Sequence, residues 1–125
     1  MSGMDKTFLQ CRECKKEYDS TFKYICDECF GPLDVHYHFP SITKDIFTNR
    51  EQTYWRYFEL LPIIDKSNIV NINAGMTPLV RAEKLGKEIG LNNLYIKNDS
   101  VNPTFSFKDR PAGVAISKAK EFGLS

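Results

Sequence analysis

Two pairs of cysteines near the N-terminus constrain the fold of this 125-residue chain more than any other feature. Cys11 and Cys14 form one C-x2-C pair, Cys26 and Cys29 form a second, and 11 residues separate the pairs. Each pair can form a tight turn that offers two thiolates to one ion, and a hairpin between them can bring the four sulfurs together. Because protein would then fill all four positions, the pattern predicts a structural metal site, with zinc as the first choice and iron as the alternative.

The chemistry of these thiols depends on where the protein resides. The N-terminal residues Met1 to Lys6 lack the apolar segment of a secretory signal, so reduced thiols and a cytoplasmic location are expected. No apolar run approaches the roughly 18 residues of a membrane helix. The formal net charge of +1, from 17 basic and 16 acidic residues, gives no electrostatic case for nucleic acid or for a membrane surface. Vestigial thiols and redox use remain the alternatives to metal binding.

Residues 1–39 are predicted to form a zinc-ribbon-like unit. Aromatic and branched residues flank each cysteine pair, and Gly31-Pro32 marks a turn. The segment 33–39 alternates apolar and polar residues, as a strand does. A unit of this size has too small a core to fold alone, so metal is expected to supply its stability. His36 and His38 are interpreted as part of a solvated strand face, because no further ligands for a second metal site are found.

Residues 40–68 are predicted to connect this unit to the rest of the chain. Two short helices are expected, near 42–47 and 53–61, with the second ended by Pro62. The cluster Tyr54-Trp55-Arg56-Tyr57-Phe58 carries more aromatic surface than a free linker would. Packing is the preferred interpretation, since the neutral net charge argues against stacking on nucleic-acid bases.

Residues 69–125 follow an α/β pattern. Strands are expected at 69–72 and 94–97, with a turn at 73–78, a helix at 82–89 and a second helix from near Lys108 to Phe122. The second helix carries a stripe of small and apolar residues at helical spacing: Ala112, Ala115, Ile116, Ala119 and Phe122. Strands separated by helices predict a parallel sheet covered on both faces. One or two strands cannot form such a sheet, so the chain is expected to be the N-terminal piece of a longer protein.

The segment Asn102 to Arg110, which reads N-P-T-F-S-F-K-D-R, places Lys108 just past a turn and at the start of a helix. The helix macrodipole disfavours a positive charge there, which would suit a lysine that must lose its proton and act as a nucleophile. Ser106 and Asp109 form an S-x-x-D pattern that can cap the helix. From spacing alone, an ordinary cap with a solvated lysine remains an open interpretation.

This motif resembles the cofactor-lysine motif of the fold type II, tryptophan-synthase-β-like pyridoxal-phosphate enzymes, usually written N-P-T-x-S-F-K-D-R. The segments 73–79 and 94–99 are similar to elements of the same enzymes. Combined with the cysteine pairs and the Trp-Arg-Tyr element, they resemble the N-terminal portion of the threonine synthases. The resemblance implies the first part of a three-layer α/β catalytic domain over residues 69–125. It also implies that Lys108 binds pyridoxal phosphate covalently and that Phe107 packs against the pyridine ring.

The reaction implied by this resemblance is that of a lyase in threonine biosynthesis. It converts O-phospho-L-homoserine and water to L-threonine and phosphate, with a small molecule as the partner. The phosphate cradle and the partner of the pyridine nitrogen would lie beyond Ser125, so the 125 residues alone are expected to be inactive. The sequence is compatible with a homo-oligomer but does not determine the oligomeric state.

Two positions depart from the family pattern and leave alternatives open. Phe105 stands where many relatives have glycine, and Met76 stands where glycine or another residue is common. The alternatives are another fold type II enzyme, of the cysteate-synthase-like or amino-acid ammonia-lyase kind, and a zinc-ribbon binding module attached to an enzyme remnant.

Overall fold

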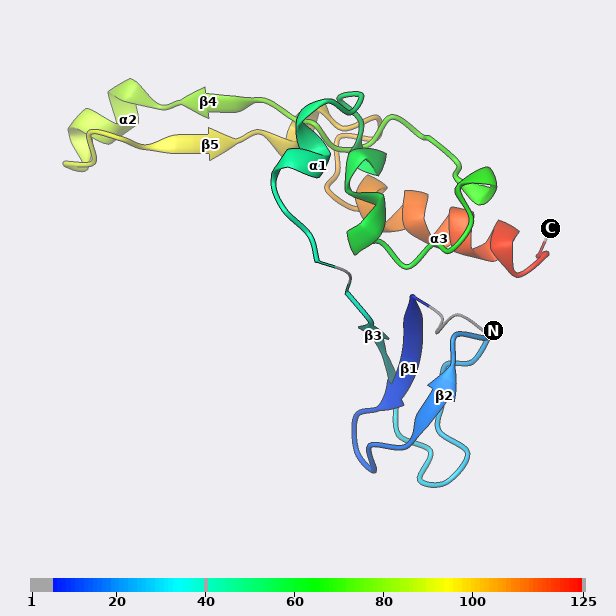
Figure 1. Cartoon of the computed structure of the whole chain (residues 1–125). Helices are drawn as coiled ribbons and strands as arrows, with labels where there is room; N and C mark the ends of the chain where they lie inside the picture. The colour runs from blue at the N-terminus through cyan, green and yellow to red at the C-terminus, as the bar shows by residue number, and fades with distance from the viewer. Residues whose placement is uncertain (1–5, 40, 125) are drawn as a thin grey trace.

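A three-stranded antiparallel sheet forms the N-terminal part of the chain (Figure 1). In the computed structural model, which describes residues 6–39 and 41–124, β1 (Thr7–Cys11) lies between β2 (Glu17–Asp19) and β3 (Leu33–Tyr37). Leu9 pairs with Tyr18 on one side and with Val35 on the other. Thr7, Leu9 and Cys11 alternate with half-buried residues, so one face of β1 forms the small core of this sheet. The strand expected at 33–39 is thereby confirmed.

Two short helices follow, as expected. These are α1 (Asp45–Thr48) and η1 (Tyr54–Leu60), a 3-10 helix that ends before Pro62. The aromatic cluster packs within the protein: the ring centroids of Phe47 and Tyr57 lie 5.2 Å apart, and those of Tyr54 and Trp55 lie 5.8 Å apart. Packing, rather than an exposed stacking platform, is therefore what these side chains do here.

The prediction of a strand at 69–72 is wrong. After η2 (Lys66–Asn68) the chain runs extended beside the C-terminal helix α3 (Asp109–Glu121), without a strand partner among the described residues. Val70 N–H donates to Ser117 Oγ at 2.9 Å, and a Cβ placed on Gly113 would lie 3.4 Å from Ile72. A helix face thus supplies the hydrogen bond and the packing that a neighbouring strand would have supplied.

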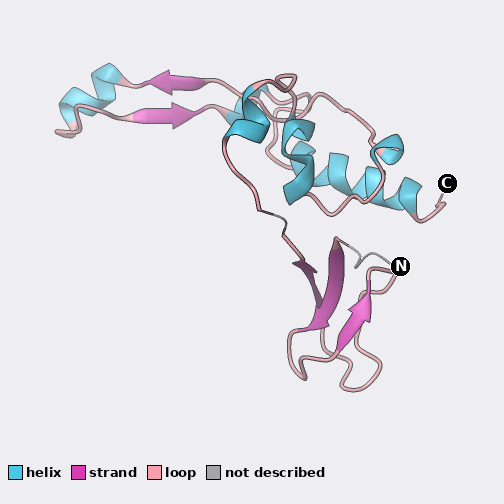
Figure 2. Ribbon diagram, viewed as in Figure 1, coloured by secondary structure: helices cyan, strands magenta, loops and turns pink. Residues whose placement is uncertain are grey.

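The parallel sheet expected from the strands at 69–72 and 94–97 is also absent from the described residues, and the second of these strands pairs with one that was not predicted. β4 (Leu79–Arg81) and β5 (Tyr95–Lys97) pair antiparallel, with Val80 opposite Ile96. The intervening α2 (Glu83–Glu88) lies at the tip of this hairpin and covers neither face (Figure 2). The chain reverses directly after this short helix, where Leu91 N–H donates to Gly86 O at 2.8 Å and Gly90 has a φ of 75°. A helix of six residues is too short to carry the chain back to the starting end, as a parallel crossover requires.

The last element, α3, begins one residue after Lys108 and ends at Glu121, close to its expected bounds. Its buried face is not the predicted stripe. Asp109, Gly113 and Ser117 are buried, whereas Ile116, a member of the stripe, is 48% exposed. The cause is the segment that packs on the helix. The extended residues 69–72 contact the face that carries the small residues Gly113 and Ser117, rather than the predicted stripe.

Among residues 6–39 and 41–124, no helix combines the length and the apolar character needed to cross a bilayer.

Candidate functional site

Lys108 occupies the N-cap position of α3, with φ −64° and ψ −16°. Its side chain is exposed, and its Nζ lies 4.7 Å from the centroid of the Phe107 ring. Phe107 is itself 56% exposed, so the amine and the ring form an open surface at the end of the loop. The two residues singled out from the motif are therefore neighbours in space and accessible to a ligand.

The loop before Lys108 is closed by an internal carboxylate clamp. Asp109, only 6% exposed, accepts hydrogen bonds from the Thr104 N–H at 2.8 Å and from Thr104 Oγ1 at 2.6 Å. Ser106 Oγ accepts from the Lys108 N–H at 3.2 Å. The predicted S-x-x-D cap thus takes another form. The Asp109 carboxylate accepts from Thr104 rather than from the Ser106 N–H, and Ser106 Oγ accepts from Lys108 rather than from the Asp109 N–H.

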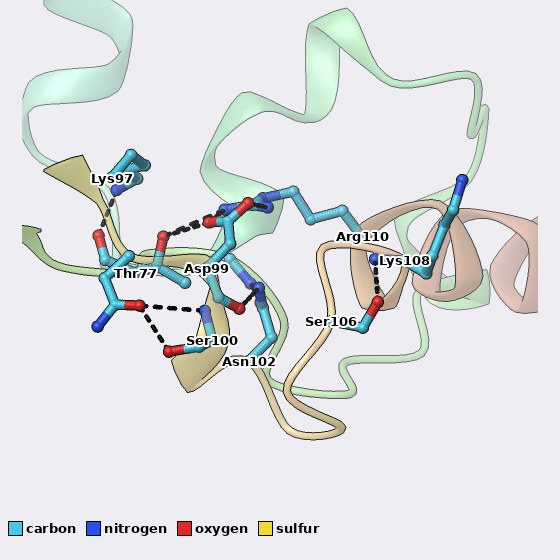
Figure 3. A network of polar contacts seen from close by, with 10 residues as sticks. Thr77, Lys97, Asp99, Ser100, Asn102, Ser106, Lys108 and Arg110 are labelled. Atoms are coloured by element: carbon cyan, nitrogen blue, oxygen red, sulfur yellow. Dashed lines mark hydrogen bonds and ion pairs between the residues drawn. The ribbon is translucent and has the colours of Figure 1, made fainter.

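A second clamp ties the start of α3 to two other segments (Figure 3). Arg110 makes a bidentate ion pair with Asp99, the first residue of η3 (Asp99–Val101), with N–O distances of 2.6 and 2.8 Å. Thr77 Oγ1 donates to Asp99 at 2.8 Å and accepts from Arg110 at 3.2 Å. The hydrogen bonds from Arg110, followed by that from Thr77, lower the pKa of Asp99 to about 2. The carboxylate therefore stays charged across the physiological range.

Asn102 joins the same region from inside. Its side chain is 2% exposed; Oδ1 accepts from the Gly75 N–H and Nδ2 donates to Asp99 O, both at 2.9 Å. The sequence predicted Asn102 only as a turn residue. The sequence did not predict that Arg110 contacts Asp99 and Thr77. The opposite charges of Asp99 and Arg110, on either side of the lysine loop, are a signal that could have suggested the first of these contacts.

The two positions that depart from the family pattern share a backbone feature. Phe105 has a φ of 59° and Met76 a φ of 48°, both in the left-handed region that favours glycine. Phe105 is 80% exposed, the largest exposed fraction among the large hydrophobic side chains described. Glycine would adopt the backbone conformation of either position without this steric cost.

The four cysteines meet at one end of the N-terminal sheet. Their sulfur atoms all lie within 4.8 Å of one another, with Cys11 and Cys29 3.4 Å apart and Cys14 and Cys26 3.5 Å apart. A tetrahedral site with metal–sulfur bonds of about 2.3 Å separates its sulfurs by about 3.8 Å. The arrangement therefore fits a single zinc ion with only small adjustments.

The two cysteine loops are built alike. In the first, Cys11 N–H donates to Lys16 O and Lys15 N–H donates to Cys11 O. In the second, Cys26 N–H donates to Gly31 O and Phe30 N–H donates to Cys26 O. The fourth residue after the first cysteine of each loop has a positive φ, 64° for Lys15 and 58° for Phe30. Two equivalent loops facing each other are the geometry that a four-sulfur site requires.

Further contacts surround the sulfurs. The Tyr18 hydroxyl accepts from Asp27 N–H and lies 3.1 Å from Cys26 Sγ, and this side-chain hydrogen bond lowers the pKa of the Cys26 thiol to about 6. A Cβ on Gly31 would lie 3.1 Å from Cys11 Sγ and 3.3 Å from Cys29 Sγ. The surroundings thus favour the thiolate at Cys26, whereas burial and hydrogen bonds with the neighbouring cysteines raise the pKa of Cys14 to about 12. A side chain at position 31 would crowd the sulfurs.

His36 and His38 lie on one side of their strand, as expected, and both rings stack on Phe8, with centroid distances of 5.3 and 4.8 Å. Among the described residues, the cysteines are the single group of three or more side chains placed to hold a metal.

Comparison with known proteins defines the class first. Residues 70–123, which include the lysine loop and α3, match the family described as pyridoxal-phosphate dependent enzyme. This part of the chain is thus similar to the pyridoxal-phosphate dependent enzymes, as the lysine motif indicated.

The particular relatives are threonine synthases. The chain is 42% identical over 120 residues to the threonine synthase of Methanocaldococcus jannaschii, an overlap of 92% of this chain and 29% of the relative. It is 39% identical over 120 residues to that of Methanosarcina acetivorans, covering 94% of this chain and 29% of the relative. That of Synechocystis is 45% identical over 73 residues, 58% of this chain and 18% of the relative. No solved structure is matched.

These relatives confirm the resemblance to the N-terminal portion of the threonine synthases. The chain spans 29% of the length of the threonine synthases of Methanocaldococcus jannaschii and Methanosarcina acetivorans.

Proposed function

We propose that this chain supplies the cofactor-binding lysine of a threonine synthase, a pyridoxal-phosphate-dependent lyase that converts O-phospho-L-homoserine and water to L-threonine and phosphate. The observation that carries the proposal is the placement of Lys108, which projects freely from a clamped loop at the start of α3. The similarity of the chain to threonine synthases over 120 residues supports the choice of reaction.

The residues of the loop fit a covalently bound aldehyde cofactor. Lys108 offers an exposed amine, and among the described residues no carboxylate forms an ion pair with it. Nζ would bond to the aldehyde carbon and, once displaced by the substrate amine, would move protons between substrate carbons. Phe107, beside Nζ, would pack against the pyridine ring. The cofactor, when bound, supplies an electron sink for the carbanions of this chemistry.

The cofactor phosphate is a separate requirement, because tight binding takes several backbone N–H donors. In the described loops several of these donors are already engaged: the N–H of Thr104 by Asp109, that of Lys108 by Ser106 and that of Gly75 by Asn102. We therefore expect groups outside residues 6–124 to hold the phosphate and to complete the substrate site. A polypeptide of these 125 residues alone is expected to show no threonine-forming activity.

The four cysteines are proposed to hold a structural zinc ion. In this proposal residues 1–39 form the zinc-ribbon-like unit, 40–68 the connector and 69–125 the beginning of the catalytic domain. A cytoplasmic location, where the thiols stay reduced, belongs to the same proposal.

Phosphate release from O-phospho-L-homoserine tests the reaction. The protein as its gene encodes it, supplied with pyridoxal phosphate, is expected to form phosphate and threonine in equal amounts. Lys108→Ala is expected to lower the rate by at least about a thousandfold, because it removes the nucleophile and the proton carrier together. Lys84→Ala, on the exposed α2, is the matched control and is expected to keep the wild-type rate. Release of ammonia in place of phosphate would instead support the ammonia-lyase alternative.

A further inference from the structure

Arg110 connects three separate segments of the chain beside Lys108. Its Nη1 lies 2.6 Å from Asp99 Oδ2 and its Nη2 lies 2.8 Å from Asp99 Oδ1. Nη2 also donates to Thr77 Oγ1, which itself donates to the same carboxylate. We propose that Arg110, together with Asp99 and Thr77, is a positioning group that holds the first turn of α3 so that the Lys108 amine is presented for covalent attachment. This inference rests on the proposed role of Lys108.

The helix geometry allows one residue to be anchored while the other stays free. Residues two apart on an α-helix point in directions that differ by about 200°. Arg110 accordingly reaches toward Asp99, whereas Lys108 projects away from the ion pair (Figure 3). The clamp therefore fixes the backbone that carries Lys108 and makes no contact with its amine.

The clamp also keeps nearby negative charge occupied. Asp99 receives two N–H groups from Arg110 and a hydroxyl from Thr77, and Asp109 receives the N–H and the hydroxyl of Thr104. A carboxylate committed to several donors has little capacity left to bind an ammonium group. Neither carboxylate forms an ion pair with Lys108 among the described residues.

The step that depends on this placement is simple. The neutral amine of Lys108 attacks the aldehyde carbon, a carbon–nitrogen double bond forms, and the aldehyde oxygen leaves as water with the two amine protons. Borohydride then delivers a hydride to that carbon and makes the bond permanent. An amine displaced from its productive position reacts more slowly, and a shift of about 1 Å can cost up to about a hundredfold in rate.

The test measures where the protein is labelled. The protein as its gene encodes it is treated briefly with pyridoxal phosphate and then with borohydride, and peptide mass spectrometry gives the ratio of label on Lys108 to label on Lys84. Arg110→Gln is expected to lower this ratio about tenfold. Arg110→Lys, which keeps the charge but loses the planar fork, is expected to restore part of the ratio. Thermal unfolding, recorded in parallel, shows that each variant is folded.

Arg50 offers a matched control. It makes an equivalent bidentate pair with Glu59, with N–O distances of 2.6 and 2.8 Å and similar exposure, in a different part of the chain. Arg50→Gln is expected to lower the melting temperature and to leave the labelling ratio unchanged. A purely structural role for Arg110 predicts the same behaviour for both variants.

The outcomes separate the two proposals. If wild-type protein shows no preference for Lys108 over Lys84, the proposed role of Lys108 fails. If wild type prefers Lys108 and Arg110→Gln keeps the same ratio, the positioning role is overturned while the role of Lys108 stands. Should Arg110→Gln fail to fold, Thr77→Val removes a single hydroxyl from the network and decides instead. It is expected to lower the ratio about twofold to threefold, and an unchanged ratio overturns the inference.

Discussion

Phe105 is a bulky residue in a backbone conformation that suits glycine. Its φ of 59° places it in the left-handed region, where a side chain costs roughly 1–2 kcal/mol. Because the ring is 80% exposed, burial returns little of that cost.

We therefore predict that Phe105→Gly stabilises the protein. The relief of backbone strain exceeds the extra flexibility that glycine adds to the unfolded chain, which is worth about 0.5–1 kcal/mol. The expected gain is about 0.5–1 kcal/mol in the free energy of unfolding, measured by urea denaturation. Phe107→Gly is the control, since Phe107 is exposed but is not in the left-handed region, and it is expected to destabilise. A loss of stability in Phe105→Gly as large as in Phe107→Gly would contradict this explanation.

At the residue scale, the sequence indicated which residues belong to the candidate site but not which side chains they contact. Lys108 and Phe107 could be singled out because their motif is contiguous, and the structure places them side by side. The partners of Arg110 could not be predicted, because Asp99 and Thr77 lie 11 and 33 positions away and meet it only after the loops have folded.

For the cysteine loops, the prediction from the sequence agrees closely with the structure. Spacing alone predicted that the four sulfurs would converge, and the structure brings them within 4.8 Å of one another. The apolar core of this unit is small: Leu9, Cys11 and Cys26 are its buried apolar side chains within the described residues. Two of these three would be ligands of the proposed zinc ion, so we expect the ion to supply much of the stability of the unit.

We predict one zinc ion per chain, measured by elemental analysis of protein purified without added metal. Cys26→Ser is expected to lose the zinc and to unfold the N-terminal sheet, seen as loss of amide exchange protection in β1 and β3. His36→Ala and His38→Ala are expected to retain the full zinc content, because these rings stack on Phe8. Full zinc content in Cys26→Ser, or loss of zinc in a histidine variant, would disprove the four-sulfur site.

The hairpin β4–β5 shows why other elements could not be predicted. The sequence pattern identified β5 and α2 but not β4, and the direction of pairing depends on where the chain turns. Gly90 reverses the chain after only six helical residues, and the strands become antiparallel. The prediction of a strand at 69–72 was wrong for a related reason. Its residues pack on α3, and periodicity does not show whether an apolar segment packs on a strand or on a helix.

At the scale of the whole molecule, the cysteine unit and the lysine-bearing helix face each other across an open cavity of about 560 Å³. Phe22 and Phe122 meet at its edge, with ring centroids 5.8 Å apart. Lys6 contributes a second link, since its Nζ donates to the carbonyls of Phe58 and Ile63. The two parts therefore touch at few points, and loss of the metal is expected to disturb the N-terminal sheet more than the lysine loop.

The central claim is that Lys108 binds pyridoxal phosphate, and the most direct test is to locate the bound cofactor. The protein as its gene encodes it would be incubated with pyridoxal phosphate, treated with borohydride, digested and analysed by mass spectrometry. We predict that the peptide containing Lys108 carries most of the label, and that Lys108→Ala lowers the total label to the low level found on other exposed lysines such as Lys84. Label spread evenly over the lysines, or retained in Lys108→Ala, would contradict the assignment of this chain's function.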